Sequence, residues 1–224
     1  MLRCVPHLVV VLLLPLSAAA SAEPLRVKAS PATAPCVEAA VAAYRSATGR
    51  ATLVETGPVE GSNAGQSFDV VVGADEELTR VIEGGSAHPD YDIDVAKVPW
   101  VLLGASAGSS TVKALSVADA KVKVVEGPVG LEARSWLRRS GRATVSGSVP
   151  RGGPVRLDVG ELALVPASLD GGSLGMVVDV PPMVVRAVGM RASRHLTLVG
   201  EFLAFLEKGP GNAAFCTCGR REPR

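Results

Sequence analysis

A serine, an aspartate and a histidine occur in the sequence in an order that suits nucleophilic catalysis. Residues 104–108 read GASAG, which fits the G-x-S-x-G motif after an apolar stretch. Asp170 and His195 follow, giving the order Ser, Asp, His of the α/β-hydrolases. In such a site Ser106 would be the nucleophile of an exported serine esterase, activated by His195. The motif needs a strand that turns sharply into a helix, and no convincing helix follows Ser106, so the esterase is an alternative hypothesis.

The cysteines and histidines lack the spacing of a metal site. Cys216 and Cys218 are separated by one residue, whereas zinc sites usually separate such a pair by two or more. Cys36 belongs to no second pair, and His88 and His195 are far apart in the chain. Isolated imidazoles are more often surface or core residues than ligands or bases. We therefore expect neither a metal nor a cofactor.

The first 22 residues have the pattern of a secretory signal peptide. Arg3 precedes an apolar run over residues 8–16, and small residues fill 17–22. The apolar run is too short to span a bilayer, and cleavage is expected near Ala22. No later stretch is long and apolar enough to anchor the chain. We expect a soluble protein, periplasmic or secreted, that is at most peripheral to a membrane.

Charge and composition exclude several kinds of partner. Without the leader, which contributes Arg3, the chain has 22 basic and 22 acidic residues. This balance favours neither nucleic acid nor an acidic membrane surface. The sequence is 47% hydrophobic but 4% aromatic, so its core must consist of Val, Leu and Ala, as in a buried parallel sheet. Three mature cysteines in an exported chain favour one disulfide and one remaining thiol.

Strand and helix patterns alternate in the first part of the mature chain. Leu25–Ala29 is a predicted strand, and apolar residues at helical spacing predict a helix from about Pro35 to Gly49. Further strands are predicted over 51–55 and 68–72. A second helix is expected over 75–84, with Asp75 as its N-cap and glycine at its end. This alternation predicts an α/β fold with a parallel sheet.

A change of pattern after Asp90 predicts a crossing into a second lobe. The extended stretch through 98–103 would carry the chain across, and a second extended stretch, 177–189, would carry it back to a last helix over 196–206. The second lobe is expected to hold a strand over 122–125, a helix over 131–139, a Gly/Pro/Ser-rich connection over 140–153 and a strand over 161–165. The predicted division is 1–22 signal peptide, 23–97 plus 178–224 first lobe, and 98–177 second lobe.

Four segments resemble, in order and spacing, the periplasmic solute-binding proteins of ABC transporters, in particular the molybdate-binding group with the type II fold. They are LRVKASPATAPCVEAAVAAYRSATG, FDVVVGADEELTRVIEGG, KVVEGPVGLEARSWLRRSG and LVGEFLAFLEKGPGNAAF. The resemblance implies two α/β lobes joined by two crossing strands, a small oxyanion held between them, a permease as partner, and a monomer. It also implies that the first and last helices share a lobe, where Cys36 would form a disulfide with Cys216 or Cys218.

The resemblance also implies the ligand-binding positions. Ser30 matches the first-loop serine, Thr56 follows the second strand, and Ser62 is the alternative to Thr56. Val129 and Gly130 lie where the second lobe offers a backbone N–H group. Helix starts present unpaired N–H donors and a partial positive charge, so they hold an anion without Lys or Arg. A serine beside a proline also commonly caps a helix or fills a turn, which is the alternative for Ser30.

The chain departs from the family at two places. No helix fits the Gly-rich stretch 56–66, so Thr56 lacks a helix start behind it. Pro166 stands where the family has a tyrosine, and proline has neither a hydroxyl nor an N–H group to offer. The sequence therefore predicts an exported solute-binding protein for a small oxyanion such as molybdate. A non-transporting scaffold or sensor with the same fold is a further alternative, beside the esterase.

Overall fold

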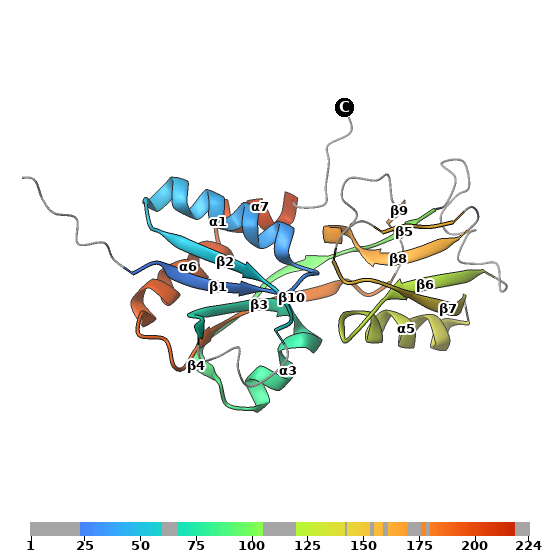
Figure 1. Ribbon diagram of the computed structural model, residues 1–224, viewed down its shortest axis with the longest axis horizontal. Coiled ribbons are helices and arrows are strands. Elements are labelled where there is room, and N and C mark those ends of the chain that lie inside the picture. The colour runs from blue at the N-terminus through green and yellow to red at the C-terminus, as the bar shows by residue number, and fades with distance from the viewer. Residues whose placement is uncertain are drawn as a thin grey trace, which may run out of the picture.

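The computed structural model describes residues 23–59, 67–104, 120–141, 143–152, 155–158, 161–169, 176–177 and 180–217. Within these ranges the strands form two five-stranded sheets, and each sheet belongs to its own lobe (Figure 1). The expected α/β, two-lobed architecture is therefore confirmed. Among the described helices, none has the length and apolar character to cross a membrane.

The first lobe is built on a mixed sheet. Its strands, in spatial order, are β2 (Thr52–Thr56), β1 (Leu25–Ala29), β3 (Val70–Ala74), β10 (Met183–Met190) and β4 (Ala87–Val98). β1 is parallel to β2 and β3, whereas β10 is antiparallel to β3 and β4. The predicted parallel pairing holds for β1, β2 and β3, and the sheet is mixed because β10 brings the chain back from the second lobe in the opposite direction. Every residue of the central strand β3 is buried.

Helices cover both faces of this sheet (Figure 1). Helices α1 (Ala34–Thr48), α6 (Leu196–Glu207) and α7 (Pro210–Thr217) lie on one face, and α3 (Asp75–Glu83) lies on the other. Alternate residues of β3 serve the two faces: Val70 and Val72 pack in the core under α1, whereas Val71 packs against α3. Helix α7 follows the last helix that the sequence predicted, and it was not predicted.

The ends of α1 agree with the sequence, but the start of α3 does not. Helix α1 has a proline in its first turn and ends at Gly49, whose φ of 68° is left-handed. The N-cap of α3 is Ala74 rather than Asp75. The carboxylate of Glu77 accepts the Ala74 N–H group at 3.0 Å, and Asp75 pairs with Arg186 of β10 at 2.5 Å. Arg186 thereby fixes the start of α3 on the sheet.

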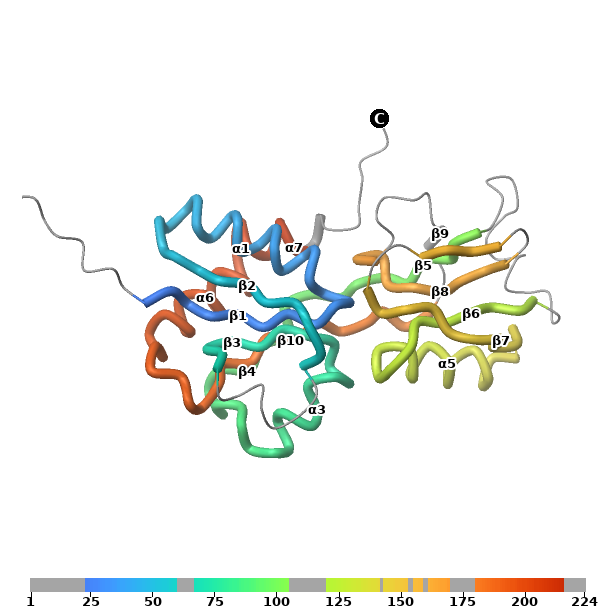
Figure 2. Tube along the Cα trace, viewed as in Figure 1, coloured from blue at the N-terminus to red at the C-terminus, as the bar shows by residue number. Residues whose placement is uncertain are grey.

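The second lobe is also built on a mixed sheet (Figure 2). Its strands, in spatial order, are β7 (Thr144–Val149), β6 (Lys121–Val125), β8 (Leu162–Pro166), β5 (Trp100–Leu103) and β9 (Met176–Val177). Helix α5 (Val129–Ser140) packs on β6 and β7, and the short helix η1 (Ala167–Leu169) follows β8. The sequence predicted a connection where β7 lies, because this edge strand is rich in Ser and Gly and has no continuous apolar run.

Prolines mark both segments that join the lobes. Pro99 stands between β4 and β5, and Pro181–Pro182 directly precede β10. Met183 of β10 pairs with Val98 of β4, so the two crossing segments lie side by side. The N–H group of Ala167 donates to the carbonyl oxygen of Pro99 at 2.9 Å, which ties the second lobe to this crossing. Proline fixes φ and has no N–H group, so the crossings are stiff.

Candidate functional site

The two lobes meet where β1 and β3 of the first lobe and β6 of the second lobe end. Ligands of α/β proteins usually bind outside the carboxyl ends of the parallel strands, so this meeting surface is the candidate site. We call it the interlobe face. Its contacts join residues 31–32 and 76–77 of the first lobe to residues 132, 151–152 and 168 of the second. Residues 30, 33, 56–57 and 129–131 adjoin these contacts along the chain or the sheet and are counted with the face.

Ser30 follows β1 at the interlobe face, and its side chain is fully buried. Its Oγ lies 3.2 Å from Thr33 Oγ1, and its carbonyl oxygen accepts the Thr33 and Ala34 N–H groups at 3.0 and 2.9 Å. Its own N–H group donates to the carbonyl oxygen of Val72 at 2.9 Å. Ser30 therefore already shapes the turn before α1, and its contact with a ligand remains a prediction.

Thr56 lies beside the Ser30 turn, as the family resemblance implies. The register of β1 and β2 places Thr56 next to Ala29, and the Gly57 N–H group donates to the Ala29 carbonyl oxygen at 3.0 Å. Thr56 is exposed, so its hydroxyl is accessible. The fold thus brings Ser30 and Thr56 together at one sheet edge, whereas Ser62 lies outside the described residues.

Val129 and Gly130 form the first turn of α5, on the second lobe's side of the interlobe face. Both residues are buried. A Cβ atom on Gly130 would lie 1.9 Å from the carbonyl oxygen of Val125, so glycine is required for α5 to approach β6 this closely. The Gly130 N–H group donates to the carbonyl oxygen of Gly127 at 3.2 Å. Its use for a ligand remains a prediction.

Ser168 supplies a hydroxyl near the position where Pro166 has none. Its side chain is buried, and its Oγ donates to the carbonyl oxygen of Ala32 in the first lobe at 2.7 Å. This hydrogen bond joins η1 to the turn that precedes α1. Ser168 was not among the predicted site residues; the signal was a small hydroxyl residue three positions after the end of the predicted strand 161–165.

An ion pair crosses the interlobe face beside this hydrogen bond. Arg151 Nη1 lies 3.4 Å from Glu77 Oε1, and the Glu77 side chain is wholly buried. A buried carboxylate needs such partners to offset its loss of hydration. Glu77 also supports the start of α3, because its carboxylate accepts the Ala74 N–H group. The partnership with Arg151 depends on the packing of the lobes, which the local sequence does not report.

Glu76 of α3 lies near enough to Glu132 of α5 for the two carboxyl groups to interact at the interlobe face. Burial raises the pKa of its carboxyl group to about 7 against the opposing effect of a backbone hydrogen bond, and the carboxyl groups of Glu132 and Asp75 raise it further. Its Oε2 atom is buried and has no hydrogen-bond partner among the described residues. The interlobe face therefore brings two acidic side chains from different lobes together.

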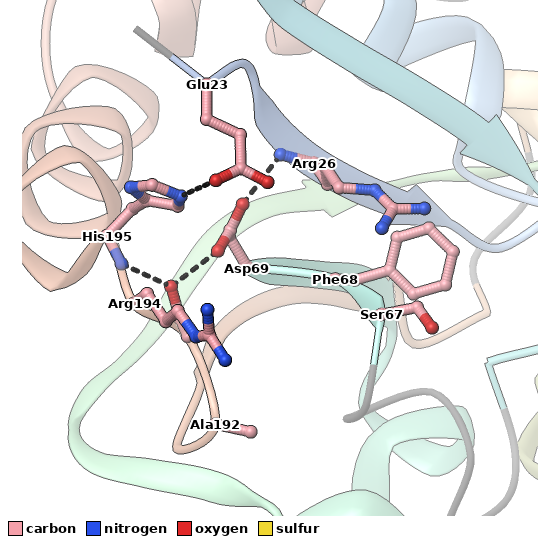
Figure 3. Close-up of a pocket in the computed structure, with 9 residues that line it drawn as sticks. Glu23, Arg26, Ser67, Phe68, Asp69, Ala192, Arg194 and His195 are labelled. Atoms are coloured by element: carbon pink, nitrogen blue, oxygen red, sulfur yellow. Dashed lines mark hydrogen bonds and ion pairs between the residues drawn. The ribbon is translucent and has the colours of Figure 1, made fainter.

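A separate polar pocket lies at the other end of the first lobe (Figure 3). It has a volume of about 410 Å³ and is lined by residues at the start of β1, before β3 and after β10, among them Glu23, Arg26, Phe68, Asp69, Ser193, Arg194 and His195. Asp69 accepts the Arg26 N–H group at 2.8 Å and the Ser193 hydroxyl at 2.5 Å. Because this is the amino end of the parallel strands, the pocket is not the candidate site.

Of the three residues of the esterase alternative, His195 lies in the described part of the chain. His195 lies in this pocket, where its Nε2 is 3.4 Å from Glu23 Oε2. Ser106 and Asp170 lie outside the described residues, but Gly104, two positions before Ser106, directly follows β5 in the second lobe. Gly104 has a φ of +83°, and a Cβ atom there would lie 2.2 Å from the Glu161 carbonyl oxygen. The first glycine of the motif is therefore explained by packing.

Part of the cysteine prediction falls on described residues. Cys36 is buried in α1 and is disulfide-bonded. Helix α7, which carries Cys216, packs against α1. The side chains of Cys216 and Cys218, like the leader, lie outside what the structure describes, so the pairing remains a prediction. Among the described residues, no group of three or more His, Cys, Asp or Glu side chains is arranged to hold a metal ion.

Comparison with known proteins identifies the fold but no sequence relative. No family model matches the chain, and no curated protein sequence matches it. Among solved structures, the periplasmic molybdate-binding protein of Azotobacter vinelandii is similar with a TM-score of 0.60 and 16% identity, covering 89% of this chain and 100% of that one. Peb3 from Campylobacter jejuni has a TM-score of 0.65 and 16% identity over the same shares, and it is also known with L-phospholactate bound.

A regulatory domain shares the architecture. The OxyR2 regulatory domain from Vibrio vulnificus is similar with a TM-score of 0.56 and 14% identity, covering 84% of this chain and 98% of that domain. Together these structures confirm the two-lobed fold of type II periplasmic binding proteins that the sequence predicted. At such identities the likeness concerns the fold, and the solute has to be argued from the interlobe face.

Proposed function

We propose that this protein is an exported solute-binding protein that holds a small oxyanion, such as molybdate, between its two lobes for an ABC importer. The observation that carries the proposal is the direct contact of the helix starts of both lobes. The turn before α1 accepts a hydrogen bond from Ser168, and Glu77 in the first turn of α3 pairs with Arg151 of the second lobe. A solute at this surface would touch both lobes at once.

The chemistry of the interlobe face suits an anion of moderate size. Helices α1 and α5 begin there, and the dipole of a helix favours negative charge at its start. The hydroxyl groups of Ser30, Thr56 and Ser168 surround the same surface. Molybdate and the phosphoryl group of phospholactate both present tetrahedrally arranged oxygen atoms, so a tetrahedral oxyanion is the ligand class that the fold comparisons support.

Binding would work through movement of the lobes rather than through a chemical reaction. A ligand that contacts both lobes stabilises the closed form over the open form. The closed form would then be what a permease recognises at the membrane, with the protein acting as a soluble monomer. Ser30, Thr56, Ser62, Val129 and Gly130 are the proposed ligand positions, and Ser168 is added from the structure.

A thermal-shift screen of the mature chain tests the proposal. Molybdate, tungstate, sulfate, phosphate, phospholactate and small organic acids form the panel, because a ligand that binds the folded state raises the apparent stability by mass action. At least one oxyanion should raise the melting temperature in a concentration-dependent manner. A melting temperature that no member of the panel changes would contradict the proposal.

A sensor or scaffold without transport is the second candidate. It is favoured by the likeness to a regulatory domain and by the hydroxyl of Ser30, which is engaged with Thr33. Gene context separates the two candidates, since a transport component should be encoded beside a permease and an ATPase. Turnover of a chromogenic ester that disappears in Ser106→Ala would instead support the esterase.

A further inference from the structure

The polar pocket at the amino end of the first lobe's parallel strands is lined by charges that the fold leaves without charged partners. It has a volume of about 410 Å³ (Figure 3). Small-molecule sites measure about 300 to 1,000 Å³, so its size suits a small ligand. Asp69, Arg26 and Arg194 all line the pocket, and none of them forms an ion pair with another described residue. The class of ligand follows from what these three side chains lack.

Asp69 is a buried carboxylate that is held by neutral donors. Its exposed fraction is 6%, and its carboxylate accepts the Arg26 backbone N–H group at 2.8 Å and the Ser193 hydroxyl at 2.5 Å. Neutral donors offset only part of the hydration that a buried charge loses. A carboxylate accepts about four hydrogen bonds, so Asp69 has capacity left for a positively charged donor in the pocket.

Arg26 and Arg194 supply unused N–H donors to the same pocket. The Arg26 guanidinium lies over the Phe68 ring, with Cζ 5.4 Å from the ring centroid (Figure 3). This cation–π contact holds the group in place through the face of the ring. Neither guanidinium donates a hydrogen bond to an acceptor among the described residues. A planar guanidinium with free donors matches a carboxylate, which it can bind through two parallel hydrogen bonds.

The other charged groups near the pocket already have partners. Glu23 Oε2 lies 3.4 Å from His195 Nε2. Lys28, the next outward-facing residue of β1 after Arg26, pairs with Glu55 at 2.5 Å. A simple anion at the arginines would be repelled by the buried aspartate, and a simple amine at the aspartate would be repelled by the arginines. A molecule that carries both charges meets both requirements.

We propose that this pocket binds a free α-amino acid as its zwitterion, with the ammonium group on Asp69 and the carboxylate on Arg26 and Arg194. Ser193 supports the anionic side, because its hydroxyl donates to Asp69 and accepts the His195 N–H group at 3.0 Å. The site belongs to the first lobe alone. It therefore depends neither on the oxyanion nor on closure of the lobes, and the protein carries it in addition to the interlobe face.

A histidine resonance reports binding in this pocket directly. Of the three histidines, His7 belongs to the leader, and the mature chain is used without an affinity tag. His195 lines the pocket, whereas His88 packs against Tyr91 with ring centroids 4.8 Å apart. The imidazole signals are followed by NMR at constant pH while each proteinogenic amino acid is added to about 10 mM, which detects millimolar dissociation constants. His195→Gln assigns the signals.

At least one amino acid should shift the His195 signal in a saturable manner. No shift at His195 with any amino acid would overturn the proposal.

Two analogues of each amino acid that binds test the requirement for both charges. The carboxylic acid without the amino group and the amine without the carboxylate keep the same side chain; for phenylalanine these are 3-phenylpropionate and phenethylamine. Each should bind at least about tenfold more weakly, as expected for a lost hydrogen bond between charged groups. An analogue that binds as tightly as its parent amino acid would show that the pocket does not recognise the zwitterion, and the proposal would fail.

Variants of the two arginines test whether the ligand lies in this pocket. Both side chains are exposed, so the double variant Arg26→Gln, Arg194→Gln should fold like wild type. It should bind the amino acid at least about tenfold more weakly. Arg80→Gln, Arg138→Gln is the matched control, because it removes two exposed arginines from other parts of the molecule and should bind normally. Equal affinities of the two double variants would place the ligand elsewhere and contradict the proposal.

This proposal and the proposed function fail independently. An oxyanion that raises the melting temperature should do so equally in wild type and in Arg26→Gln, Arg194→Gln, because the interlobe face is unchanged in this variant. An oxyanion response that disappears there would show that the pocket holds the oxyanion, and it would overturn the amino-acid assignment. A thermal-shift screen in which no oxyanion responds leaves the NMR titration unaffected.

Discussion

The hydroxyl of Ser168 in the second lobe donates a hydrogen bond to the carbonyl oxygen of Ala32 in the first lobe, at 2.7 Å. Ser168→Ala removes this donor, and a buried hydrogen bond contributes about 1 kcal/mol. We expect the affinity for the oxyanion identified in the thermal-shift screen to fall about fivefold, measured by calorimetry. Ser46→Ala, on the exposed side of α1, is the matched control. Equal affinities of the two variants would exclude this contact from closure.

Ser30→Ala tests the position that the sequence identified first. If Ser30 Oγ donates to a desolvated anion, its loss should weaken binding by about 1 to 2 kcal/mol. Thr33→Val separates ligand contact from support of the turn, because it removes the partner of Ser30 and keeps the Ser30 hydroxyl. We expect Thr33→Val to lower the melting temperature with little loss of affinity. Unchanged affinity in Ser30→Ala would remove this residue from the site.

Arg151→Met tests the ion pair with the wholly buried Glu77. The substitution keeps an apolar stem and leaves the buried carboxylate with one partner fewer. We expect the free energy of unfolding in urea to fall by about 2 kcal/mol, less than for a fully buried pair because Arg151 is partly exposed. Arg151→Lys should lose less, and Arg139→Met on the exposed side of α5 should lose almost nothing. A loss in Arg139→Met equal to that in Arg151→Met would mean that the ion pair is not the cause.

Glu76 should make the stability of the folded chain depend on pH. Burial and its acidic neighbours raise the pKa of Glu76 to about 7 in the folded chain, so the group contributes full stability below its ordinary value of 4.5. This contribution is lost as the pH rises through 7. Because the side chain is partly exposed, we expect a loss of about 1 to 2 kcal/mol between about pH 5 and about pH 8, measured as the difference between wild type and Glu76→Gln. Glu38→Gln, on the exposed side of α1, should follow wild type at every pH.

The disulfide of Cys36 should join α1 to the last helix. Helix α7 packs against α1 and carries Cys216, so we expect a Cys36 to Cys216 bridge and a free thiol at Cys218. A bridge across so long a loop stabilises the folded state by about 2 to 5 kcal/mol, and Cys216→Ser should lose this amount in chemical denaturation. Cys218→Ser is the matched control and should unfold like wild type. Non-reducing peptide mapping decides, and a peptide linking Cys36 to Cys218 would contradict the pairing.

Local patterns predicted the elements of this fold because its core is built from simple periodicities. The strand Leu25–Ala29 was predicted with the bounds that the structure shows, and α1 and α6 were predicted to within about one residue at each end. These segments have clear apolar faces and a glycine or proline near an end. Strand β7 was missed because an edge strand needs no continuous apolar run, and α7 was missed because its eight residues are a small-residue segment with a weak apolar stripe.

The candidate site was predicted only in part, since it forms where distant segments meet. Ser30 and Thr56 are brought together by a parallel register that the alternation of strands made predictable. The contacts of Ser168, Arg151 and Glu132 with the first lobe depend on how the lobes pack, and no local pattern encodes that packing. Asp75 shows the same limit: the sequence favoured it as a cap, whereas Arg186, which lies far along the chain, holds it in the structure.

The prolines at both crossings limit how the lobes can move, and under the proposed function this limits the size of the solute. Pro99 and Pro181–Pro182 remove rotation about φ where the chain changes lobe, and the paired Val98 and Met183 keep the two crossings aligned. Such a joint favours swinging about one axis over sliding or twisting. Under the proposed function, a solute too large for the interlobe face would therefore keep the two lobes apart. The protein would select its solute by size rather than adapt its shape to it.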